Sequence, residues 1–437
     1  MLPRLRFALF LTVFIALFGI PLIAVAQDKV EIEMWLLDEE SRQCVADTIT
    51  TLFNATSTTS QINIVLQPNV DDALRTALVG GGGPDIVQSG GTAFAQQYAQ
   101  AGLLLPLDEY VTQFGWDDRF VPWALELGKF DDVLYTLPDS LETLVIWYNK
   151  TLFEDRGWQV PTTMEELFTL SQTIADAGIV PFGNAFGECL ECMGWLPGAF
   201  INHYAGPDLM YQALTGQISW TDPVFVESIT KLNEMVQNGW FGGSVDLLFT
   251  DSFDTVHSML GSGDAAMTLD GSWSNLTDYF GAEAGNDNDF DWFPIPTASG
   301  EVLYTTGVGE TSSINANTQH PQEAAEFLTW YFSPDVQAER FSQCSWPPAP
   351  IQATADNYSQ ADPRTARIYA EYGTAAGDGH YGYTTWTFFP NAMGVAVNED
   401  IQKVFLGSLT PEEYMQNLQN LFAEAVADNT IPPIPAR

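Results

Sequence analysis

The feature that most constrains the fold is a regular alternation of strand-like and helix-like segments near the start of the chain. Strand-like apolar segments are followed by helix-like ones, and the run "GGGG" at residues 80–83 closes one of the helices. The segments follow one another as strand, helix, strand, helix, strand and helix at residues 29–37, 45–53, 61–67, 71–79, 85–87 and 92–101. This order and spacing predict α/β units with a mostly parallel sheet.

The pattern continues through the rest of the chain. Residues 141–148, "LETLVIWY", are typical of a buried strand, and a helix capped by Thr162 or Thr163 follows and ends at Gly178. Further helices are predicted at residues 222–238, 321–332 and 409–427, the last with Thr410 as its cap and Pro411 at its first position, and a surface loop is predicted at residues 281–291. A chain of 437 residues is long enough for two lobes, each with its own core.

The first residues resemble a targeting segment instead of part of the fold. Arg4 and Arg6 precede an apolar run, and Ala24-Val25-Ala26 has the small residues of a signal-peptidase site. Residues 1–26 are therefore predicted to be a secretory signal peptide, so the protein is expected to be exported, periplasmic or extracellular, at the outer face of the cytoplasmic membrane. Retention as a membrane anchor is the alternative, because the run approaches spanning length.

The charge of the chain excludes several classes of partner. There are 56 acidic residues against 15 basic ones. Such a surface repels nucleic-acid phosphates and anionic lipids, and it leaves few cations to bind an anionic ligand. A neutral or cationic ligand is favoured, and a solvated acidic surface explains most of the charge without any function.

Cysteine usage fits an oxidising compartment better than a metal centre. Cys189 and Cys192 form an isolated CxxC, and the four histidines are scattered, so a zinc site is not predicted and no cofactor is implied. A small disulfide between Cys189 and Cys192 is predicted, together with a bridge between Cys44 and Cys344.

The sequence contains no motif of a common catalytic site. A phosphate-binding loop, a GxSxG turn and an HExxH helix are all absent. Carboxylates are plentiful, so a pair of acids that hydrolyses glycosides stays an alternative, although most acidic side chains belong to the surface.

Tryptophan is the more informative residue type. Several of the 13 tryptophans lie at strand ends or beside turn residues, where core packing is harder to achieve: Trp35, Trp195, Trp273, Trp346 and Trp386. In "AAMTLDGSW", an apolar run ends in Asp-Gly-Ser and Trp273 follows. An indole face can stack on a sugar ring while nearby polar groups bind its hydroxyls, and core packing is the alternative for each ring.

Four segments, in this order, resemble the carbohydrate-binding branch of the extracellular solute-binding proteins of bacterial ABC importers, the group of maltose-binding protein. They are "GGGGPDIV" (80–87), "LYTLPDSLETLVIWYNKTLFEDRGWQVPTTMEELFTLSQTIADAGIVPFG" (134–183), "LGSGDAAMTLDGSW" (260–273) and "GVGETSSINANTQHPQEAAEFLTWYFSPDVQ" (307–337). The resemblance covers essentially the whole chain after the signal peptide.

The resemblance implies an α/β fold of the two-lobed periplasmic-binding-protein type (type II), with the ligand in the cleft between the lobes. Lobe I is expected at residues 27–137 plus 304–332, and lobe II at 138–303 plus 333–437. The hinge crossings are expected near residues 135–139, 296–304 and 331–335. Closure of the hinge around the ligand would be the signal that the membrane permease reads.

Matching positions imply the ligand contacts. These are Trp35, Glu39 and Glu40 after the first strand, Ser89, Thr92, Asp139 and Glu142, and then Trp195, Asp270, Trp273, Gly307, Gly309, Trp346 and Trp386. The chain departs from the family at Ser89 and Thr92, where an aromatic or acidic residue is frequent. It departs again in "CSWPPAP" (344–350), where many relatives carry an arginine.

Together these observations predict a non-enzymatic, exported and monomeric binding protein for a neutral mono- or oligosaccharide, partnered by the membrane subunits of an ABC importer. The same fold with a cationic or quaternary-amine solute is one alternative, because tryptophans beside carboxylates also suit cations. A secreted glycosidase is the other.

Overall fold

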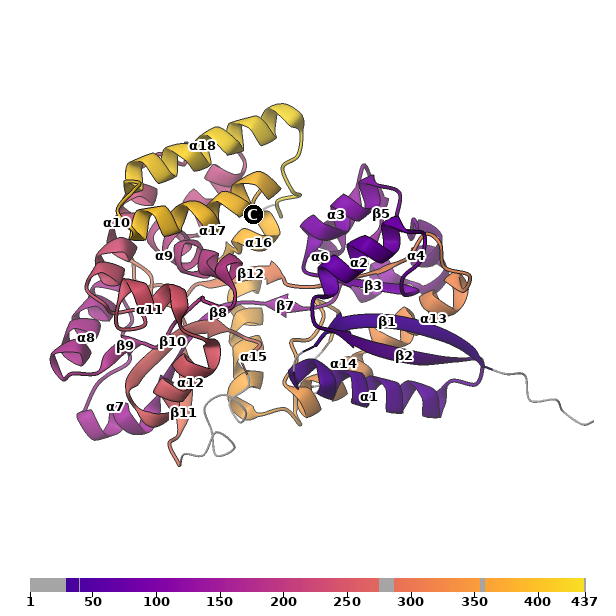
Figure 1. Cartoon of the computed structure of the whole chain (residues 1–437), viewed down its shortest axis with the longest axis horizontal. Helices are drawn as coiled ribbons and strands as arrows, with labels where there is room; N and C mark the ends of the chain where they lie inside the picture. Colours follow the sequence, from indigo (N-terminus) through magenta and orange to yellow (C-terminus); the bar gives the residue numbers. More distant parts are fainter. Residues whose placement is uncertain (1–28, 39, 275–286, 354–357, 436–437) are drawn as a thin grey trace, which may run out of the picture.

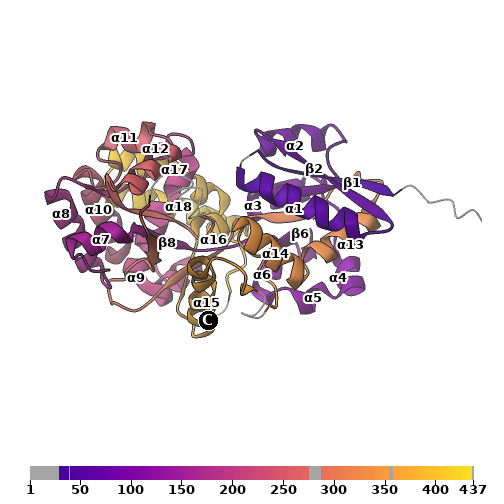
Figure 2. The same cartoon turned by 90° about the horizontal axis from the view of Figure 1, so that it is seen from below.

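The structure, a computed structural model, describes residues 29–38, 40–274, 287–353 and 358–435. Two α/β lobes lie side by side, and the segments β7 (Leu141–Glu142) and β12 (Tyr304–Val308) run between them (Figure 1). We call the lobe that contains β1 lobe I and the lobe that contains β8 lobe II. Figure 2 shows the same two lobes from below, with the first third of the chain in lobe I.

The sheet of lobe I has the strand order β2-β1-β3-β13-β6, with β1 (Val30–Leu37) parallel to β2 (Ser60–Gln67) and β3 (Ile86–Ser89). The strands β13 (Thr311–Ile314) and β6 (Thr136–Pro138) complete the sheet in antiparallel pairing. The other elements of this lobe are α1 (Glu40–Thr56), α2 (Val70–Val79), α3 (Thr92–Gln100), α4 (Asp108–Phe114), α5 (Trp116–Arg119), α6 (Pro122–Glu126), the hairpin β4 (Lys129–Phe130) and β5 (Val133–Leu134), α13 (Pro321–Tyr331) and α14 (Pro334–Cys344).

Two of the quoted motifs form one junction at the edge of this sheet. Asn315, just after β13, donates from Nδ2 to the carbonyls of Gly82 and Pro84 at 3.0 and 2.9 Å. Asp85 accepts the backbone N–H of Glu33 in β1 at 2.9 Å. The Pro-Asp-Ile and Ile-Asn segments therefore bind each other, which explains why both residue types occur at these positions.

The sheet of lobe II has the order β11-β8-β10-β9, built from β11 (Phe290–Phe293), β8 (Leu144–Asn149), β10 (Ala265–Gly271) and β9 (Val180–Phe182). A smaller sheet, β14-β12-β7, adds β14 (Tyr381–Tyr383). The helices of this lobe are α7 (Lys150–Arg156), α8 (Met164–Asp176), the short 3-10 helix η1 (Leu190–Gly194), α9 (Trp195–Leu214), α10 (Pro223–Gln237), α11 (Val245–Thr250), α12 (Phe253–Ser262), α15 (Pro363–Gly377), α16 (Thr385–Phe388), α17 (Asn391–Phe405) and α18 (Pro411–Asp428).

Local capping signals in the sequence correspond to helix starts in the structure. The Thr163 hydroxyl accepts the backbone N–H of Glu166 at 3.2 Å, and the Glu166 carboxylate accepts the backbone N–H of Thr163. The helix α8 therefore begins in a capping box. Thr410 and Glu413 form the same arrangement at α18, with Pro411 at the first position. The predicted starts of both helices are confirmed, because a capping box is decided by residues three apart.

The division of the chain between the lobes differs from the expected one at β12 and at α14. Tyr304 and Val308 of β12 pack in cores that contain residues of β8 in lobe II, although residues 304–332 were assigned to lobe I. Val336, Cys344 and Trp346 pack in the core of lobe I together with residues of β1 and α1, although residues 333–437 were assigned to lobe II. The physical reason is that α14 is tied to α1 by a disulfide between Cys44 and Cys344. The chain therefore returns to lobe II after Ile351, not at residues 331–335.

Two local predictions in lobe II are also corrected. The expected strand 141–148 is two strands, because Ser272 donates its backbone N–H to the carbonyl of Thr143 and accepts the Thr143 N–H at its hydroxyl. Thr143 thus separates β7, which pairs with β12, from β8. Phe290 and Asp291 were expected in a surface loop but belong to β11, where they pair with Asn149 and Tyr148. The predicted signal peptide and residues 281–286 lie outside the described residues.

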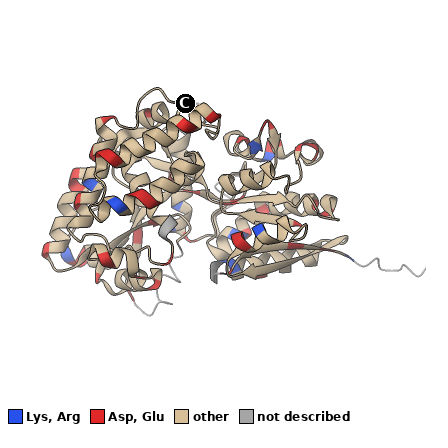
Figure 3. Cartoon of the chain, turned by 45° about the horizontal axis from the view of Figure 1, so that its top comes forward, with Lys and Arg blue, Asp and Glu red and all other residues tan. Residues whose placement is uncertain are grey.

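Acidic residues outnumber basic residues in this chain. Acidic residues occur along the helices of both lobes, and basic residues are fewer among them (Figure 3). Within the described ranges, no helix combines the length and the apolar character needed to cross a bilayer.

Candidate functional site

Three of the predicted tryptophans lie together in lobe II. The ring centroids of Trp195 and Trp273 are 5.1 Å apart, and those of Trp273 and Trp386 are 6.3 Å apart. All three side chains are partly buried. They come from the start of α9, the turn after β10 and α16, which are far apart in the sequence. We call Trp195, Trp273 and Trp386 the tryptophan group.

The turn after β10 explains the position of Trp273. Every residue of β10 is buried, and the Asp270 carboxylate accepts the backbone N–H of Gly271 at 2.7 Å as the strand ends. The ring of Trp273 folds back over Gly271, so closely that a Cβ at residue 271 would overlap it. A glycine before Trp273 is therefore required for the ring to reach Trp195 and Trp386.

A glycine-lined junction connects the tryptophan group to lobe I. Gly91 precedes α3, and a Cβ built there would lie 3.7 Å from the carbonyl oxygen of Gly309 and 3.9 Å from that of Trp386. A Cβ at Gly309 would overlap the carboxylate of Glu142. The backbone of Gly309 thus lies between α16 on one side and the Glu142 side chain on the other, where the segments β7 and β12 run between the lobes.

Charged side chains lie beside this junction. The guanidinium of Arg42 in α1 forms an ion pair with Glu310, and the side chains of both residues are about one tenth exposed. Glu142 accepts a hydrogen bond from the Ser140 hydroxyl at 2.9 Å. Burial and the neighbouring Glu310 raise the pKa of Glu142 to about 8, while Ser140 and Arg42 act in the opposite direction. We call Arg42, Glu142 and Glu310 the charged group.

Trp346 holds Arg42 from the lobe I side. The guanidinium carbon of Arg42 lies 3.7 Å from the centroid of the Trp346 ring, within cation–π distance. Cys44 and Cys344 form a disulfide, and their Cα atoms are 5.6 Å apart. Cys44 lies two residues after Arg42 in α1, and Trp346 lies two residues after Cys344. The disulfide therefore fixes the two segments that carry the stacked pair. Cys189 and Cys192 are also bonded, just before Trp195.

Asp139 is held in a buried network instead of facing the junction. It is fully buried, and its carboxylate accepts bonds from Arg340 Nη1 at 2.6 Å, Gln88 Nε2 at 3.1 Å and Ser312 Oγ at 2.6 Å. Tyr331 donates to it as well, at 3.2 Å. With every oxygen already bonded, Asp139 is better assigned to the support of the crossing segment than to ligand contact.

The remaining predicted contacts are distributed around lobe I and β12. Trp35 belongs to β1, not to a loop after it, and its Nε1 donates to Glu33 at 2.7 Å while the ring packs beside α2 and α3. Ser89 is bonded to Thr311 at 3.0 Å, and Thr92 is buried in the first turn of α3. Gly307 packs on Thr384. Glu40 begins α1, and Glu39 lies outside the described residues.

Sequence reasoning missed Arg42 and Glu310. A signal for Arg42 was available, because a cation in the first turn of a helix opposes the helix dipole and is unusual without another role. Basic residues are also few in this chain. Glu310 follows directly after Gly309 in "GVGET", a segment considered only for its glycines.

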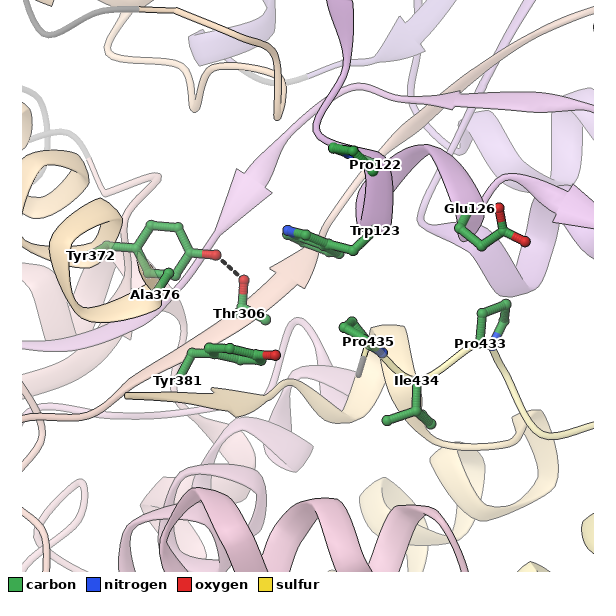
Figure 4. Close-up of a pocket in the computed structure, with 10 residues that line it drawn as sticks. All are labelled: Pro122, Trp123, Glu126, Thr306, Tyr372, Ala376, Tyr381, Pro433, Ile434 and Pro435. Atoms are coloured by element: carbon green, nitrogen blue, oxygen red, sulfur yellow. Dashed lines mark hydrogen bonds between the residues drawn. The ribbon is translucent and has the colours of Figure 1, made fainter. Parts of the chain in front are cut away.

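A separate cavity of about 500 Å³ lies beside the same crossing segments and contains none of these residues. Trp123 of α6 and Tyr381 of β14 lie on opposite sides of it, and Pro433, Ile434 and Pro435 of the C-terminal tail close one end (Figure 4). Tyr372 is hydrogen-bonded to Thr306 at its inner wall. The tail thus reaches from lobe II to α6 of lobe I.

Comparison with known proteins places these observations in a family context. The sequence profile described as bacterial extracellular solute-binding protein matches residues 43–338. Maltotriose-binding protein of Pyrococcus abyssi is 26% identical over 272 residues, which cover 61% of this chain. The chain spans 54% of the length of that protein. Multiple sugar-binding protein of Streptococcus mutans is 22% identical over 358 residues, covering 79% of this chain and 81% of that protein.

Solved structures share the fold. A chitin oligosaccharide binding protein superposes with a TM-score of 0.74 over 92% of this chain and 100% of that chain, at 21% sequence identity. A likeness of this extent confirms the two-lobed periplasmic-binding-protein fold (type II) predicted for the chain.

Proposed function

Because the chain belongs to the bacterial extracellular solute-binding proteins, we propose that it binds a neutral mono- or oligosaccharide between its lobes and delivers it to an ABC importer. The observation that supports this proposal is that the tryptophan group and the charged group both lie beside one junction between the lobes. The carbonyl oxygens of Trp386 and Gly309 are both within 4 Å of the Cβ position at Gly91, and the Glu142 carboxylate lies against Gly309. Indole faces supply stacking surfaces, and the charged group supplies hydrogen-bond partners for hydroxyls.

The names of the relatives support a sugar as the ligand. They include proteins described as binding maltotriose, alpha-glucosides and diacetylchitobiose. The proposal includes export of the mature chain, a monomeric state and partnership with permease subunits, as in an importer of this kind. The energy of ligand binding would be used to close the lobes, and closure would be recognised at the membrane. No bond of the sugar is broken in this function.

A thermal-shift screen of the mature chain tests the proposal. The panel is maltotriose, raffinose, diacetylchitobiose and galactose, with tetramethylammonium and spermidine as cationic probes. A ligand at a thousand-fold excess over its Kd stabilises the folded protein by about 4 kcal/mol, so the melting temperature rises clearly. A shift with the cations alone contradicts sugar binding, and chromatography that finds cleaved sugar contradicts the non-enzymatic function.

Replacing Trp273 by alanine should weaken sugar binding by about 1–3 kcal/mol, because the ring is the central member of the tryptophan group. Isothermal titration calorimetry with the sugar found in the screen measures the effect. Trp158→Ala is the matched control, since Trp158 is also partly buried in lobe II but packs on Phe153, away from the group. Equal losses in both variants, or unfolding of Trp273→Ala, would show that Trp273 is a core residue.

A further inference from the structure

Glu142 occupies a position where its charge is poorly compensated. Its carboxylate lies against the Cα of Gly309, and among the described residues its hydrogen-bond donor is the Ser140 hydroxyl. The side chain is partly buried, so it has lost part of its hydration while an incoming ligand can still reach it. A carboxylate that loses water without gaining a cation is destabilised in its charged form.

The groups around Glu142 do not supply that cation. Arg42 is the nearest positive charge, and it is already paired with Glu310 and stacked on Trp346. Tyr369 of α15 also faces Glu142, and burial raises its pKa far above the usual value, so it stays neutral. Arg340 is bonded to Asp139. The Arg42 guanidinium therefore has two carboxylates near it, Glu142 and Glu310, and its ion pair is with Glu310.

The charge balance decides the form of Glu142 at neutral pH. Burial and the negative charge of Glu310 raise its pKa to about 8. The carboxyl is therefore mostly protonated at pH 7, and the charged group then carries no net charge. A protonated carboxyl has an O–H donor, which an ionised one lacks. A ligand oxygen can accept that hydrogen, whereas a cation has no oxygen to offer and meets no negative charge.

We propose that Glu142 determines ligand specificity by binding as a neutral carboxylic acid that donates a hydrogen bond to a hydroxyl or ether oxygen. The inference rests on the proposed sugar function and deepens it, since it selects uncharged, hydroxylated ligands over cationic ones at this position. Binding then weakens as the pH rises and Glu142 ionises. If only the protonated form binds, the affinity falls about tenfold between pH 7 and pH 9.

Calorimetry at pH 6, 7 and 9 tests the inference, with the sugar found in the screen or, failing that, with maltotriose. The wild type is expected to lose about tenfold in affinity from pH 7 to pH 9. Glu142→Gln, which cannot ionise, is expected to have the same affinity at both pH values, whatever that affinity is. Glu424→Gln is the matched control, because Glu424 lies exposed on α18, and it should keep the pH dependence of the wild type.

A second measurement needs no ligand. The folded state holds the proton on Glu142 up to about pH 8, whereas the usual pKa of a glutamate is 4.5. The stability from this proton is present below about pH 4.5 and is lost as the pH rises through 8. The melting temperature of Glu142→Gln should therefore rise relative to that of Glu424→Gln between pH 5 and pH 9.

The outcomes separate this inference from the function on which it rests. Equal wild-type affinity at pH 7 and pH 9, or tighter binding of tetramethylammonium than of sugar with Glu142 intact, overturns the inference. Melting temperatures of the two variants that stay parallel from pH 5 to pH 9 overturn it as well. Absence of any sugar binding at any pH contradicts the proposed function, while the melting temperatures still decide whether Glu142 is protonated.

Discussion

Replacing Arg340 by methionine should destabilise the folded protein by about 3–5 kcal/mol, because it leaves the buried carboxylate of Asp139 without its cation. Arg340 is fully buried and bonds through Nη1 to Asp139 Oδ1 at 2.6 Å and through Nη2 to the Asp139 carbonyl at 3.0 Å. It also donates to the carbonyl of Pro347 at 2.9 Å, so one side chain joins α14, the segment after Trp346 and the first crossing. Urea denaturation at pH 7 measures the loss.

Arg75→Met is the control for the same chemical change in water. Arg75 pairs with Asp72 at 3.1 Å, but the side chains of both residues are more than half exposed. Exposed pairs contribute about 0–1 kcal/mol, so this variant should be nearly as stable as the wild type. If Arg340→Met loses no more stability than Arg75→Met, then Asp139 and Arg340 do not support the hinge, and Asp139 returns to the candidate ligand contacts.

Replacing Cys44 and Cys344 together by alanine should cost about 5 kcal/mol of stability, because their disulfide joins residues 300 positions apart in the sequence. On the chain-entropy account, a loop of that length strongly restricts the unfolded chain. The same variant should weaken sugar binding, since the disulfide fixes α1 and the segment of Trp346, which position Arg42. Thermal unfolding and calorimetry check the two effects separately.

The second disulfide provides a control within the same molecule. Cys189 and Cys192 are only 3 positions apart, so the same account assigns their bond about 2 kcal/mol. The double alanine variant of this pair should therefore remain clearly more stable than the Cys44 and Cys344 variant. Equal losses in the two double variants would contradict the role given to the longer bridge.

Local rules of the sequence predicted the fold well where the deciding residues are close together. The capping boxes of α8 and α18 depend on residues three apart, and the alternation of β1 depends on every second side chain. The position of α14 was missed although the predicted bridge between Cys44 and Cys344 already placed its end beside α1, because its other distant partner, Asp139, was not predicted. Periodicity contains no information about such partners.

The candidate site shows the same division. Trp195, Trp273 and Trp386 were predicted from turn residues beside them, and the structure brings them together. Trp35 and Asp139 have similar surroundings in the sequence, but one belongs to a strand and the other to a buried ion pair. Arg42 was missed because its role depends on Trp346 and Glu310, which meet it only in three dimensions.

The most direct test of the account is a crystal structure of the mature protein with the sugar identified in the screen. The account predicts that the sugar lies between the tryptophan group and the charged group, with a ring face on Trp273 and an oxygen within hydrogen-bond distance of Glu142. A sugar bound elsewhere, for example in the cavity between Trp123 and Tyr381, with the tryptophan group unoccupied, would contradict it.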